Sequence, residues 1–164
     1  MKILNFLIYT KELMRNMGFF YFMRRHATLI PFSKQHHQIL VLAQLLKADV
    51  PDYEGLPKTI EGKREYLLKK FNEVILPNFA NHRNIFYPAI IQWGFQDELL
   101  LQQIQQWEDD VLMICKSIKE ENAISSMQLN ELGYTLDRLV RAKERELYQK
   151  VQARFSAELE ELQF

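Results

Sequence analysis

The sequence predicts an all-α protein: an up-down-up-down bundle of four helices with an N-terminal extension. Two observations support this prediction. Apolar residues recur at spacings of three and four over several long stretches, which is the period of an amphipathic helix. The 164 residues include only five glycines and five prolines, fewer than a sheet with many turns would need. A single domain of this length can bury a sizeable core.

The first residues differ from the rest of the chain. Residues 1–22 contain the apolar run Ile3–Tyr9, which is far shorter than the roughly 20 residues that cross a bilayer. No small-residue cleavage site follows this run, so we expect neither a signal peptide nor a membrane span. We expect residues 1–22 to be an extension, either an extra helix or residues upstream of a true start at Met23. Residues 23–164 are then the bundle.

The first two bundle helices are predicted on either side of a long connection. The first helix is expected over residues 33–46, where Pro31 precedes Ser33 as the N-cap. Its inward side chains are Phe32, His36, Ile39, Ala43 and Leu46. Residues 49–59 hold two prolines and a glycine and form the connection. The second helix is expected over residues 60–91, with the inward side chains Phe71, Ile75, Asn78, His82, Ile85 and Ala89.

The last two helices are predicted after a turn at Gly94. The third is expected over residues 97–119, with the inward side chains Leu101, Ile104, Glu108, Val111, Cys115 and Ile118. The spacing of Ser125 and Gln128 is that of a capping box and opens the fourth helix. The apolar stripe of this helix is formed by Leu132, Leu136, Leu139, Leu147 and Val151. Lys143 interrupts the stripe, and the charged residues 144–146 after it are expected on a solvated face.

Polar side chains interrupt the apolar stripe of every predicted helix. At a rise of about 1.5 Å per residue, antiparallel neighbours bring these side chains to similar depths. We call them the polar layer, which consists of His36, Asn78, His82, Glu108 and Lys143. A buried ammonium without a partner costs several kcal/mol or more. We therefore expect the carboxylate of Glu108 to face Lys143.

Composition and missing motifs exclude several function classes. Lys+Arg and Asp+Glu number 21 each, so no net field attracts nucleic acid, and we expect no such partner. The lone Cys115 cannot form an intramolecular disulfide or a cysteine zinc cage, which favours a reducing compartment, the cytoplasm. Because Cys115 lies on an apolar stripe, we expect a buried, inert thiol. Nucleophile elbows, phosphate loops and Glu-x-x-His pairs are missing from the sequence, so we do not expect an enzyme.

Three stretches of the sequence carry a resemblance to a known family. They are LIPFSKQHHQILVLAQLL, LPNFANHRNIFYP and LGYTLDRLVRAKERELY. Over residues 23 to about 155 the chain resembles the hemerythrin-like family, also called HHE cation-binding domains. In that family, histidines of the first and third helices and a His-x-x-x-Glu pair in the second and in the fourth hold a non-haem di-iron centre that binds or senses oxygen. The resemblance implies that only His36 is a retained ligand, and that the other ligand positions hold Asn78, His82, Glu108, Leu139 and Lys143.

Two hypotheses about function follow from these substitutions. In the first, the chain is a hemerythrin-like protein with a degenerate site that senses or binds metal or oxygen. His36, with His37 as a less inward alternative, would then hold at most one divalent transition metal such as iron together with His82 and Glu108. Two imidazoles and one carboxylate suit such an ion. In the second, Lys143 supplies the positive charge, and the chain is a metal-free structural or partner-binding bundle. A second copy of the chain or another protein could be the partner.

Overall fold

The structure is a computed structural model that describes residues 25–121 and 123–164. All regular secondary structure in these two ranges is helical, which confirms the predicted all-α class. The predicted extension over residues 1–22 and the expected bundle start at Met23 lie outside the described residues. None of the described helices is long and apolar enough to cross a membrane.

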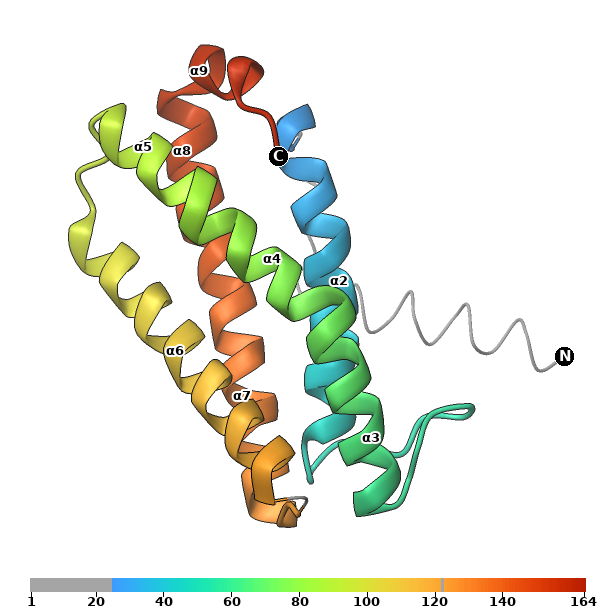
Figure 1. The fold of residues 1–164 in the computed structure, drawn as a ribbon. Helices are drawn as coiled ribbons and strands as arrows, with labels where there is room; N and C mark the ends of the chain where they lie inside the picture. Colours follow the sequence, from blue (N-terminus) through green and yellow to red (C-terminus); the bar gives the residue numbers. More distant parts are fainter. Residues whose placement is uncertain (1–24, 122) are drawn as a thin grey trace, which may run out of the picture.

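Long helical runs follow one another along the chain (Figure 1). The 3-10 turn η1 (Ala27–Leu29) leads into α2 (Ile30–Leu46). The next run is continuous and consists of α3 (Ile60–Lys70), η2 (Phe71–Ile75), α4 (Leu76–Asn81), η3 (His82–Phe86) and α5 (Tyr87–Gln92). It is followed by α6 (Glu98–Glu121), and then by the run α7 (Ser126–Ala142), η4 (Lys143–Leu147) and α8 (Tyr148–Arg154). The short helix α9 (Ser156–Glu161), which the sequence did not predict, lies at the same end of the molecule as α5. Both α2 and α6 pack against α7.

The start of α2 differs from the prediction. The helix begins at Ile30, with Pro31 in its first turn and Leu29 as an N-cap without a side-chain hydrogen bond. A proline in the first turn gives up no hydrogen bond, because the first N–H groups of a helix have no partner within it. The helix can therefore start before Pro31, and the prediction of Ser33 as the N-cap was wrong.

The starts of the later helices follow their predicted signals. The Asp97 side chain accepts a hydrogen bond from the Leu100 backbone N–H (3.1 Å) at the start of α6. The capping box at α7 is confirmed, because Ser125 and Gln128 exchange hydrogen bonds of 2.8 and 3.1 Å between side chain and backbone. Gly94 closes α5 with a positive φ of 88°, a conformation that glycine adopts without strain.

The segments η2, η3 and η4 are π-helical, which the sequence did not predict. A π turn holds one more residue than an α turn, so it shifts the inward face of the helix. After His82, the first residue of η3, the next buried side chains in register are Phe86 and Ile90. The predicted inward residues Ile85 and Ala89 are only partly buried. The prediction that these two side chains point inward was wrong, because it assumed a regular α-helix.

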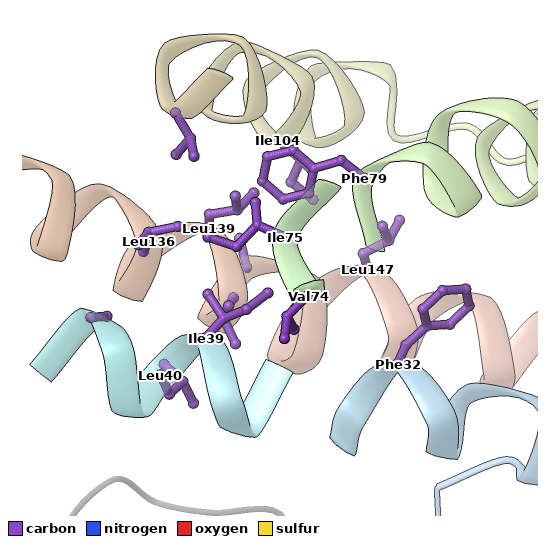
Figure 2. Packing of buried hydrophobic residues seen from close by; sticks show 14 of the residues in the cluster. Phe32, Ile39, Leu40, Val74, Ile75, Phe79, Ile104, Leu136, Leu139 and Leu147 are labelled. Carbon is purple, nitrogen blue, oxygen red and sulfur yellow. The ribbon is translucent and has the colours of Figure 1, made fainter. Parts of the chain in front are cut away.

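The inward face of α6 and the apolar stripe of α7, η4 and α8 are as predicted. Every side chain predicted to point inward from these helices is buried. Figure 2 shows Ile39 of α2, Ile75 of η2, Ile104 of α6 and Leu139 of α7 pointing into the same interior. The thiol of Cys115 belongs to this core, and its burial raises its pKa to about 12. A thiol of this kind is inert at neutral pH, as predicted.

The helices α2 and α7 are in close contact at Gly133. A Cβ atom at this position would lie 2.8 Å from the carbonyl oxygen of Ala43. It would also lie 3.1 Å from Cγ of Lys47 and 3.2 Å from Cβ of Leu46. The first of these neighbours is helix backbone and cannot rotate away. Only glycine therefore permits this approach of the two helices.

We predict that Gly133→Ala destabilises the protein by about 1–3 kcal/mol, because the added methyl group must push two backbones apart. Without the close contact, Gly133→Ala would stabilise the helix by about 1 kcal/mol, because alanine has the higher helix propensity. A loss of stability therefore indicates that the close contact is present. Urea unfolding followed by circular dichroism measures it. The exposed Gln103→Ala in α6 is the control. A Gly133→Ala variant more stable than the original chain would contradict this packing.

Candidate functional site

The polar layer is buried between the helices. None of its members is more than 1% exposed, and they come from α2 (His36), α4 (Asn78), η3 (His82), α6 (Glu108) and η4 (Lys143). Direct contacts link four of these residues: Lys143 to Glu108 and Asn78, and His82 to the backbone of Asn78. The fifth, His36, has its ring centre 5.7 Å from that of His82. The predicted layer is therefore confirmed. Burying charges in this way is costly unless each has a partner.

The ammonium of Lys143 has the predicted carboxylate beside it. Its Nζ lies 2.6 Å from Oε1 of Glu108 and 3.5 Å from the side-chain oxygen of Asn78. It also lies 4.9 Å from the centre of the Phe79 ring, which adds a cation–π contact. Burial lowers the pKa of Lys143, and the charge and hydrogen bond of Glu108 offset part of this effect.

Glu108 has two further partners. Arg83 Nε donates a hydrogen bond of 2.7 Å to Oε2, and the hydroxyl of Tyr87 donates one of 2.7 Å to Oε1. Burial and the charge of Glu108 raise the pKa of Tyr87 well above its ordinary value, so the phenol keeps its proton. Two cations and a phenol thus hold the carboxylate of Glu108. A metal ion at this carboxylate would have to compete with these three partners.

Glu144 is a second buried carboxylate, so the prediction that it lies on a solvated face was wrong. It is 2% exposed; its Oε1 accepts a hydrogen bond from His36 Nδ1 (2.6 Å) and its Oε2 from Arg25 Nη2 (2.7 Å). Burial alone would raise the pKa of Glu144, but His36 and Arg25 together bring it below the ordinary value. One sequence signal could have found this residue. Val140, Glu144 and Tyr148 recur at four-residue spacing and form a second buried stripe.

His36 has one ring nitrogen without a partner. Burial lowers the pKa of His36, and the hydrogen bond to Glu144 offsets only part of this, so the ring is neutral. Because Nδ1 donates its proton to the Glu144 carboxylate, Nε2 carries the lone pair. Within the described part of the chain this buried Nε2 has no hydrogen-bond partner.

His82 uses both of its ring nitrogens. Nδ1 lies 2.7 Å from the Asn78 carbonyl oxygen, which can only accept, so Nδ1 carries the proton. Nε2 then accepts the hydroxyl hydrogen of Tyr148 at 2.6 Å. Burial and the nearby charge of Lys143 lower the pKa of His82 well below its ordinary value, so this ring too is neutral. The ring centres of His36 and His82 lie 5.7 Å apart.

The donor groups do not fit the di-iron centre that the resemblance implies. In residues 25–121 and 123–164, no three His, Cys, Asp or Glu side chains are placed to hold a metal ion together. Both nitrogens of His82 and the carboxylate of Glu108 are committed to protein partners. The Nε2 of His36 is the exception. Binding of one metal ion by His36, His82 and Glu108 stays a prediction.

We predict that Lys143→Met destabilises the protein by about 3–5 kcal/mol, because it leaves the buried Glu108 carboxylate without its ammonium. When Glu108→Gln is present in the same chain, Lys143→Met should cost much less. A double-mutant cycle from urea unfolding measures this coupling. The exposed pair Lys116 and Glu120 (3.8 Å) is the control cycle and should show little coupling. If the two buried substitutions change the free energy of unfolding additively, Lys143 and Glu108 do not stabilise the protein as an ion pair.

A second prediction concerns pH. Burial lowers the pKa values of His36 and His82 in the folded protein below the ordinary histidine value of about 6.5, so the unfolded chain binds more protons as the pH falls below this value. Stability is therefore fully present above about pH 6.5 and decreases below it.

His82→Gln removes one of these titrations. The loss of stability between pH 7 and pH 5 should then shrink, by up to about 2 kcal/mol. Urea unfolding at pH 7 and pH 5 measures this loss of stability. The control Gln103→Ala should lose as much stability between the two pH values as the original chain. An unchanged difference in His82→Gln would mean that His82 is not held neutral in the fold.

No family model, no curated protein and no solved structure matches this chain. The resemblance to the hemerythrin-like family therefore rests on the sequence motifs alone. Function has to be inferred from the chemistry of the polar layer and its neighbours.

Proposed function

We propose that this chain is a metal-independent member of the hemerythrin-like group, in which Lys143 supplies the positive charge that a metal ion would otherwise bring. It then works as a structural or partner-binding helical protein of the cytoplasm, without a catalytic role and without a nucleic-acid partner. The observation that carries the proposal is the contact of 2.6 Å between the buried Lys143 ammonium and the buried Glu108 carboxylate.

The charges around the polar layer support this proposal. Two carboxylates are buried in the described part of the chain, and each has at least one cation within 2.7 Å: Lys143 and Arg83 beside Glu108, and Arg25 beside Glu144. A divalent ion bound to Glu108 would lie next to the Lys143 ammonium, and like charges this close repel strongly in a poorly solvated interior. The interior therefore does not need a metal ion for charge balance.

We also propose that the helices form a four-helix bundle. We take α2, the run from α3 to α5, α6, and the run from α7 to α8 as the helices of an up-down-up-down four-helix bundle. Short links between α5, α6 and α7 favour antiparallel neighbours. The packing of α2 against α3 and α7, and of α6 against α7, is consistent with this arrangement.

The Nε2 atom of His36 favours a second candidate function. A histidine whose other nitrogen donates to a carboxylate is a common form of metal ligand. His36 with Glu144 has this form, and its Nε2 is buried without a partner among the described residues. The second candidate is therefore a degenerate hemerythrin-like site that binds one divalent transition metal such as iron and senses metal or oxygen. Such binding would require Lys143 to move away from Glu108.

Elemental analysis separates the two candidates. We predict that the full chain, produced with added iron and purified without chelator, carries well below one transition-metal ion per chain. Its melting temperature should be the same with and without EDTA, because no ion contributes to the fold. The control is His36→Gln, which should carry the same background of metal. One tightly bound ion per chain, lost in His36→Gln, would contradict the first proposal and support the second.

A further inference from the structure

The outward face of α6 and α7 has features that the polar layer does not explain. A groove of about 500 Å³ runs between the two helices and is lined by Met113 and Ile114 of α6 and by Tyr134 of α7, among others. Large apolar side chains are exposed in and beside this groove: Met113 is 65% exposed, Met127 67% and Tyr134 38%. Several large apolar side chains exposed together are typical of a protein interface.

Three charged side chains line this groove: Asp110 of α6, which accepts a hydrogen bond from Gln106 (3.0 Å), and Glu131 and Arg138 of α7. Glu131 and Arg138 both line it, and they are seven residues apart on α7, which places them on one face about 10 Å from each other. Among the described residues, neither side chain has an oppositely charged partner: Arg138 reaches only the Thr135 hydroxyl at 3.5 Å and the face of the Trp107 ring at 6.0 Å.

The spacing of these charges is self-complementary. A second α7 helix, laid antiparallel about a two-fold axis midway between Glu131 and Arg138, places Glu131 of each copy against Arg138 of the other. Interfaces of this kind are isologous, so each such contact occurs twice. The axis passes beside Tyr134, whose hydroxyl donates to Asp49 at 2.7 Å and whose ring lies 4.6 Å from the Lys47 ammonium. These contacts hold the ring in place as a rigid apolar surface.

Exposed methionines lie on the same side of α6 and α7 as these charges. Because Glu108 faces Lys143 and the helices are antiparallel, Met113 lies level with Arg138, at one end of the groove. Met127 lies one turn beyond Glu131, towards the other end. Exposed apolar side chains therefore extend towards both ends of the face that carries Glu131 and Arg138.

We propose that the groove between α6 and α7 is the interface of a homodimer with two-fold symmetry, with Glu131 pairing with Arg138 across the axis. This inference does not depend on the proposed function. Glu131 and Arg138 are equally spaced about Tyr134, and pairing about a two-fold axis requires this equal spacing. A different protein partner would not require it, so the spacing favours a second copy of the chain.

Charge reversal tests the interface on the full chain. Glu131→Lys and Arg138→Glu each set like charges opposite one another twice, so each should weaken dimerisation by about tenfold or more. The double variant with both changes restores opposite charges and should dimerise like the original chain. Sedimentation velocity over a concentration series measures the dimerisation. Circular dichroism checks that these exposed positions leave the fold intact.

A mixture of the two single variants gives the most specific test. Glu131→Lys and Arg138→Glu each repel their own kind, but one chain of each forms two attractive pairs, so the mixture should dimerise where neither does alone. Glu160→Lys in α9 makes the same charge change at an exposed site away from the groove and should leave dimerisation unchanged. A chain that stays monomeric at every concentration, or a dimer that neither single variant weakens, would overturn the proposal. So would a monomer that binds a different protein through this groove.

Discussion

The ion pair between Lys143 and Glu108 is the constraint on which the interior depends. An isolated buried charge costs several kcal/mol, so α6 and η4 can pack only in the register that brings the ammonium to the carboxylate. Asn78, Arg83 and Tyr87 approach the same two groups from the run between α3 and α5, which ties that run to the register as well. Apolar contacts alone tolerate more variation in how helices slide past one another.

A second buried carboxylate extends this constraint to the first helix. Glu144 follows Lys143 in η4, and it joins His36 of α2 to Arg25, the first described residue. Lys143 and Glu144 are neighbours in η4, and they bind side chains of two different helices, Glu108 of α6 and His36 of α2. The close contact of α2 with α7 at Gly133 lies farther along the same pair of helices. Polar contacts and close packing therefore specify the same arrangement of α2 against α7.

Much of this interior could be predicted from the sequence, because regular α-helices repeat with a fixed period. The inward face of α6, the capping box at Ser125 and the pairing of Lys143 with Glu108 all followed from spacing. Periodicity failed where a π segment adds a residue, which moved the inward position from Ile85 to Phe86.

The partners of Glu144 could not be predicted for a different reason. His36 and Arg25 are more than 100 residues away, at separations of 108 and 119. No local pattern in the sequence reports contacts over such separations.

We propose that Lys143 is a charged ammonium paired with Glu108 and that it takes the place of an internal metal cation. NMR spectroscopy of the protein with ¹⁵N-labelled lysine tests this most directly, because a buried, hydrogen-bonded ammonium exchanges its protons slowly and gives a resolved signal. We expect such a signal at neutral pH. It should be lost in Lys143→Met, which assigns it, and shifted in Glu108→Gln. A neutral amine at Lys143, or an ammonium signal that Glu108→Gln leaves unchanged, would contradict it.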